Sequence, residues 1–113
     1  MEKTIMIGEH KVPMKATGNT PKRYRNEFNE DLLMKLNNLY QQTDKTTGAI
    51  NDGADLSVIE NLAYIMAKQA DPTIGSQDDW LDQFNPLDIY LSMKEIMNVW
   101  TESTQTLSQT KKG

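Results

Sequence analysis

The sequence contains no cysteine and a single histidine, His10, among its 113 residues. Without cysteine it can form no disulfide framework, no thiolate zinc site and no cysteine nucleophile. One histidine is too few for a histidine-based metal site or a catalytic triad. The serine hydroxyls lack the Gly-x-Ser-x-Gly motif of a nucleophile elbow. We therefore expect no catalytic residue, no metal site and no cofactor, and hence a protein that is not an enzyme.

Long apolar runs and a strong overall charge are also missing. No stretch approaches the ~20 apolar residues of a membrane span, and no signal-peptide apolar run follows the first charges. These absences predict a soluble intracellular protein. The net charge of −4 argues against a nucleic-acid binder. Residues 1–50 carry a net +2 and residues 51–113 a net −6, which suits contact with another protein better than contact with phosphates.

The composition that remains favours one small domain, residues 1–113, with more helix than strand. Ten leucines and seven methionines outnumber three valines. Residues 3–17 predict a β-hairpin, because apolar residues alternate on either side of a Gly8-Glu9 turn. Pro13 places the second strand at a sheet edge, with residue 13 facing outward. The hairpin must pack on the helices or on a partner, since an isolated hairpin is marginal in water.

Residues 20–100 predict a body of four to five helices. Thr20 is the expected N-cap and Pro21 the first helical residue of the helix that follows the hairpin. Asn29 either kinks a continuous helix or separates two helices, and the pattern leaves both open. Thr43–Ala54 predicts a loop.

The most buried element is expected to be the helix Leu56–Ala70, capped by Asp55 and ended by Asp71-Pro72. Its apolar residues, which include Leu62 and Met66, cover well over half of its circumference, as in a central helix. The fold class is therefore α+β.

Two further helix starts follow in the C-terminal half. Ser76 is the expected cap of a short helix, with Asp79 at its third position. Asn85 caps a last helix that begins at Pro86 and carries one apolar seam. From Thr101 the sequence turns polar, so residues 101–113 are expected to fray.

Three clusters are candidate sites. Asp78, Asp79 and Asp82 are interpreted as capping and solvated carboxylates, because no EF-hand spacing accompanies them. A basic cluster is solvated surface, a patch for an acidic protein partner or a phosphate site; it consists of Lys22, Arg23 and Arg25. A set of large apolar residues is either core or a partner-binding hot spot; its members are Trp80, Leu81, Phe84, Met93, Met97 and Trp100.

The sequence resembles the small tail assembly chaperones of long-tailed phages and prophages of Gram-positive bacteria, over roughly residues 3 to 100. It departs from the family pattern at Asn29, where the family has a glycine. The resemblance is carried, in order and spacing, by Thr4–Gly8, Val12–Thr17, Thr20-Pro21, Tyr24-Arg25, Phe28, Asp31–Leu33, Ala63–Asp71 and Trp80–Phe84.

The resemblance implies a non-enzymatic role in the host bacterial cytoplasm. Such chaperones bind and solubilise the long helical tape-measure protein, help to recruit tail tube subunits, and are absent from the finished virion. Many are also made in a longer form by programmed frameshifting, and Thr110-Lys111-Lys112 can be encoded by a slippery A-AAA-AAR heptamer. The sequence leaves self-association open. The alternative function is a small regulatory or nucleic-acid-associated module that uses Lys22, Arg23 and Arg25.

Overall fold

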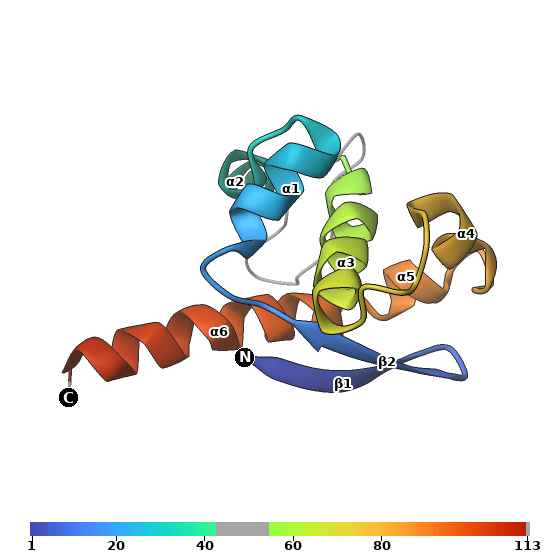
Figure 1. Cartoon of the computed structure of the whole chain (residues 1–113). Helices are drawn as coiled ribbons and strands as arrows, with labels where there is room; N and C mark the ends of the chain where they lie inside the picture. The colour runs from blue at the N-terminus through green and yellow to red at the C-terminus, as the bar shows by residue number, and fades with distance from the viewer. Residues whose placement is uncertain (43–54, 113) are drawn as a thin grey trace.

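The computed structural model describes residues 1–42 and 55–112, of which residues 105–112 are described by their backbone alone. An antiparallel two-stranded hairpin precedes a mainly helical body (Figure 1), so the expected α+β class is confirmed. The predicted loop Thr43–Ala54 lies outside the described residues. The elements are β1 (Glu2–Ile7), β2 (His10–Lys15), α1 (Thr20–Phe28), α2 (Leu32–Gln41), α3 (Ser57–Ala70), α4 (Gln77–Asp82), α5 (Asp88–Leu91) and α6 (Met93–Lys112).

The hairpin forms where the alternation predicted it. Gly8 takes a φ of 60° in the turn, a conformation that glycine adopts without steric cost. Ile5 pairs with Val12 in the antiparallel register, and both side chains lie on the buried face of the sheet. Pro13 lies opposite Thr4 with its side chain exposed, so its predicted outward orientation is confirmed.

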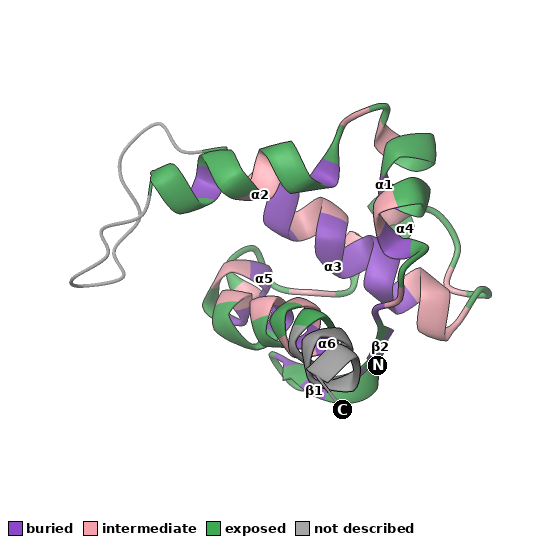
Figure 2. Ribbon diagram, turned by 90° about the vertical axis from the view of Figure 1, so that its left-hand side faces the viewer, coloured by how far each residue is buried: buried purple, intermediate pink, exposed green. Residues whose placement is uncertain are grey.

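Helix α3 is the centre of the molecule, as predicted. It contacts β2 and the other helices α1, α2, α4, α5 and α6 (Figure 1). Eight of its fourteen residues are buried, and Leu62 and Met66 are completely inaccessible to solvent. Figure 2 shows this contrast, with α3 mostly buried beside a mostly exposed α2. The core therefore lies between the inner face of the hairpin and α3.

Asn29 separates two helices, which decides between the two alternatives. It adopts the left-handed conformation, with φ 56° and ψ 37°, and its N–H donates to the Arg25 carbonyl oxygen at 2.7 Å. Asparagine and glycine are the residues that most readily end a helix this way. Asn29 thus makes the turn that a glycine would make. Asp31 then caps α2, because its carboxylate accepts from the Met34 N–H at 3.1 Å.

The start of α1 differs from the prediction by one residue. Asn19, not Thr20, is the N-cap, and Pro21 is the second helical residue. Thr20 is buried, and its hydroxyl oxygen accepts from the Thr17 N–H at 2.9 Å while its O–H donates to Gln69 Oε1 at 2.6 Å. The Thr20 side chain is used for a tertiary contact with α3, which a sequence pattern cannot show.

The N-caps of α3 and α4 agree more closely with the predicted helix starts. The Ser76 hydroxyl accepts from the Asp79 N–H at 3.2 Å, which confirms the predicted cap of α4. Helix α3 begins at Ser57, one residue later than expected, with Leu56 at the N-cap position. Asp55 still serves the helix start, since its carboxylate accepts from the Ser57 N–H at 3.0 Å.

The predicted start of the last helix was wrong. It begins at Asp88 rather than Pro86, and a turn at Ser92 divides it into α5 and α6. With the break at Asn29, this division gives six helices in the described residues instead of four to five. The backbone of α6 continues to Lys112 and projects past the body (Figure 1), while the fraying expected for residues 101–113 stays a prediction. The polar hydroxyls do not interrupt α6, since that of Ser103 donates to the Trp100 carbonyl oxygen at 2.6 Å within the helix.

Candidate functional site

A pocket of about 270 Å³ lies between α3, α4 and α5. The Ser76 cap starts α4, and one face of this short helix then turns inward while Leu81 stays half-buried at the surface. The chain leaves α4 through Phe84, which is also half-buried. The pocket is lined by Glu60, Leu81, Asp82, Phe84, Asn85, Pro86 and Ile89.

Trp80, one of the two tryptophans among the candidate partner-binding residues, belongs to the core. Its side chain is 4% exposed. Its ring lies 5.8 Å from that of Tyr64 and 5.1 Å, edge to face, from that of Phe84. Phe84 also meets His10 at 5.2 Å, so this aromatic row runs from the core to the hairpin turn. Of this row, Phe84 is the member that lines the pocket.

The remaining apolar candidates lie elsewhere. Met93, Met97 and Trp100 are half-buried on α6 and pack against the core. Trp100 also lines a separate cavity of about 350 Å³ beside Met1, at the N-terminus of the hairpin. The structure therefore does not bring the six apolar candidates together at one site. Leu81 and Phe84 are the two that share the pocket.

The most exposed leucines on this side were not among the candidates. Leu87 is 63% and Leu91 80% exposed. They are four residues apart, or about one helical turn, and so share one side of the segment. Ile89, between them in the sequence, lies on the opposite side and is buried. Leu87 and Leu91 do not belong to the apolar seam expected for the last helix, and their apolar side chains outside that seam were the signal that could have found them. We call Leu81, Phe84, Leu87 and Leu91 the α4–α5 surface.

Acidic groups border this surface. Glu60 and Asp82 line the pocket, and Asp88 lies beside the hairpin turn, where a Cβ on Gly8 would come within 2.5 Å of its Oδ2 atom. Burial raises the pKa of Tyr90, and the neighbouring carboxylate of Glu60 raises it further. A pocket lined by both apolar and acidic side chains can hold a segment that carries apolar and basic residues.

The basic cluster is a separate feature on α1. Lys22, Arg23 and Arg25 are all exposed. Helix α1 and the pair α4 and α5 lie on opposite sides of α3 (Figure 1), so the basic and apolar candidates do not form one surface. Arg23 lines a small pocket with Lys68, whose ammonium lies 4.0 Å from Glu27.

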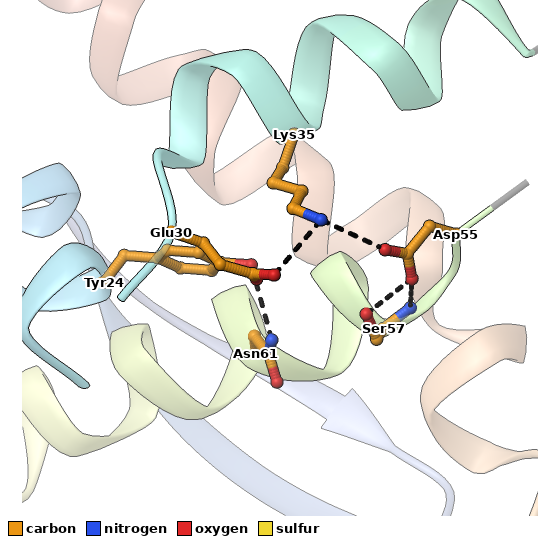
Figure 3. A network of polar contacts seen from close by, with 6 residues as sticks. All are labelled: Tyr24, Glu30, Lys35, Asp55, Ser57 and Asn61. Atoms are coloured by element: carbon orange, nitrogen blue, oxygen red, sulfur yellow. Dashed lines mark hydrogen bonds and ion pairs between the residues drawn. The ribbon is translucent and has the colours of Figure 1, made fainter. Parts of the chain in front are cut away.

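A polar network joins α1, α2 and α3 (Figure 3). Lys35 Nζ lies 3.2 Å from Glu30 and 3.4 Å from Asp55, and these hydrogen bonds raise the pKa of Lys35. Asn61 Nδ2 donates to Tyr24 Oη at 3.4 Å. Burial raises the pKa of Tyr24 despite this hydrogen bond. Asp55 in turn accepts hydrogen bonds from the N–H and the hydroxyl of Ser57, so the network links the start of α3 to α2.

Comparison with protein-family models, with curated proteins and with solved structures gave no match. Within the described part of the chain, no three acidic or histidine side chains gather closely enough to hold a metal ion. The helices described over residues 1–42 and 55–112 include none that is long and apolar enough to cross a membrane.

Proposed function

We propose that this protein is a phage tail assembly chaperone of the bacterial cytoplasm. It binds and solubilises the tape-measure protein, helps to recruit tail tube subunits and does not remain in the virion. The observation that carries the proposal is the sequence resemblance, whose motifs keep their order and spacing from the hairpin to Trp80–Phe84. A small hairpin followed by a helical body with exposed leucines suits this role.

The α4–α5 surface is the proposed docking site for a helix of the tape-measure protein. Leu81 and Phe84 line a pocket that can receive apolar side chains, and Leu87 and Leu91 are exposed apolar side chains on the segment that follows. A helix with apolar residues at i, i+3 or i+4 binds such a surface. Basic residues flanking its apolar stripe would meet the acidic border of the pocket.

Co-expression with a fragment of the tape-measure protein encoded near the same gene tests the proposal. Wild-type protein should keep the fragment in the soluble fraction, and Leu91→Glu should reduce the soluble yield several-fold. Leu91 is highly exposed, so the substitution should leave the fold intact. Leu33→Glu is the matched control, since it places the same charge at an exposed leucine of α2, and it should solubilise the fragment like wild type.

Two outcomes would contradict the proposal. If wild-type protein leaves the fragment insoluble, the chaperone function is wrong. If wild type is active and the two glutamate variants retain equal activity, the function stands and the docking surface is wrong.

A further inference from the structure

Helix α2 exposes large apolar side chains on the side turned away from α3. Leu33 is 57%, Met34 65% and Tyr40 63% exposed. Figure 2 shows most of α2 as exposed along its length. Leu33 and Tyr40 are seven residues apart, or two turns, so they lie on one stripe of the helix. Interface centres are typically enriched in such methionine and aromatic side chains.

This outer stripe carries no charge. Lys35 is the one charged residue among the ten of α2. Its ammonium is drawn toward α3 by Asp55 at 3.4 Å and toward the preceding turn by Glu30 at 3.2 Å (Figure 3). The exposed polar side chains of the helix are amides, such as Asn37 and Gln41. Depletion of charge is the compositional mark of an interface centre.

We propose that this face of α2 binds a second copy of the chain, with the two α2 helices antiparallel about a twofold axis near Asn37. This inference is independent of the chaperone function. Leu33 and Tyr40 lie at equal distances from the centre of the stripe, between Leu36 and Asn37. An antiparallel copy therefore sets Leu33 of one chain against Tyr40 of the other, twice, as a self-complementary interface requires.

The lack of charge on the outer face of α2 favours a second copy of the chain as its binding partner. Each chain carries a net −4, so two copies repel each other except where the contact itself is neutral. A nucleic acid or a charged helix would find no opposite charge on the outer face of α2, which lacks the one charged residue of the helix, Lys35. An amide both donates and accepts hydrogen bonds, so Asn37 can pair with its own symmetry mate. Asp31, exposed at the start of α2, would face the amides Gln41 and Gln42 of the other copy, not a second acid.

The small size of the face sets the strength of the contact. A ten-residue helix is about 15 Å long, and a stable specific interface buries about 800 Å² on each partner. One short helix supplies less than this area, so a weak, concentration-dependent dimer is expected. Sedimentation equilibrium between roughly 10 µM and 1 mM should show reversible dimerisation of the full chain.

A charge-swap pair at the twofold axis tests the geometry. Asn37→Glu and Asn37→Lys each place like charges against each other in a homodimer, so each variant should dimerise at least about tenfold more weakly. An equimolar mixture should restore association, because the heterodimer pairs opposite charges. Both residues form helix better than asparagine, so the fold should be kept, and circular dichroism checks this. Leu91→Glu, on α5, is the control that should dimerise like wild type.

Monomeric wild-type protein at all these concentrations would overturn the proposal. A dimer that survives both Asn37 variants, or that the mixture fails to restore, would show that its interface lies away from α2. Loss of the dimer in Leu91→Glu, with Asn37→Glu unaffected, would place that interface on the α4–α5 surface.

Discussion

Thr20 and Gln69 are 49 residues apart in the sequence, yet the Thr20 hydroxyl donates to Gln69 Oε1 at 2.6 Å. Gln69 Nε2 in turn donates to the hydroxyl oxygen of Thr17 at 3.0 Å. The two hydrogen bonds join the chain segment after the hairpin to the central helix α3. Because Thr20 is completely buried, any polar group left without its partner there is shielded from water.

Thr20→Val should destabilise the protein by about 1–3 kcal/mol, since it keeps the side-chain shape and leaves Gln69 Oε1 and the Thr17 N–H without a partner. The free energy of unfolding in urea measures the effect. Thr4→Val, on the exposed face of β1, is the control and should change stability by less than about 0.5 kcal/mol. Equal effects of the two substitutions would show that the buried hydrogen bonds contribute nothing.

Leu62→Ala should cost about 2–5 kcal/mol, because it opens a cavity at a fully buried position in the middle of α3. Leu91→Ala removes the same atoms from a side chain that is already in solvent and should cost under about 1 kcal/mol. Urea unfolding of the two variants beside wild type gives both values. A loss under about 1 kcal/mol for Leu62→Ala would mean that α3 is not the core helix.

Asn29→Gly should raise stability slightly and Asn29→Ala should lower it by about 1 kcal/mol. The residue has a φ of 56°, which glycine adopts freely and alanine does not. The gain for glycine is limited, because glycine also gives the unfolded chain more freedom. Thermal melts rank the three proteins. An alanine variant as stable as wild type would argue against the left-handed turn between α1 and α2.

Asp55 should contribute stability that is lost in acid. Hydrogen bonds from the hydroxyl and the N–H of Ser57 hold the pKa of Asp55 below its usual value. The unfolded chain therefore binds this proton first as the pH falls. The contribution is complete above the unfolded pKa of about 3.9 and disappears as the pH falls through the folded pKa.

Asp55→Asn removes this titration. Urea midpoints at neutral pH and at decreasing acidic pH should show wild type falling more steeply than the variant, so that the difference between them shrinks. A difference that stays constant across this range would show that the carboxylate has no special stabilisation in the folded state.

The codons of Thr110-Lys111-Lys112 test the frameshift expectation that follows from the chaperone family. Thr-Lys-Lys can be written ACA AAA AAR, which contains the A-AAA-AAR heptamer on which paired tRNAs can slip by one base. We expect this heptamer in the gene, with an overlapping −1 frame upstream of a long helical reading frame. An ACC, ACG or ACT codon at Thr110, or AAG at Lys111, would exclude slippage at this position.

The sequence by itself determined the elements whose signals are local. Alternation on either side of Gly8 specified the hairpin and the outward Pro13, and a broad apolar surface specified α3 as the central helix. The cap at Ser76 could also be predicted, because it requires only a serine hydroxyl oxygen and the backbone N–H three residues later.

The tertiary structure alone decided which apolar residues are covered. Trp80 and Leu91 are both large apolar residues in helical segments, yet Trp80 packs between Tyr64 and Phe84 while Leu91 faces solvent. Whether each residue is covered depends on which side of its short helix packs against α3. For α5, the position of the break at Ser92 determines which side that is. Ser92 lies beside the Met6 carbonyl oxygen, its hydroxyl donating at 3.3 Å across 86 residues of sequence. Periodicity within one helix carries no information about such a distant contact, so the sequence could predict the helices but not the surface they leave exposed.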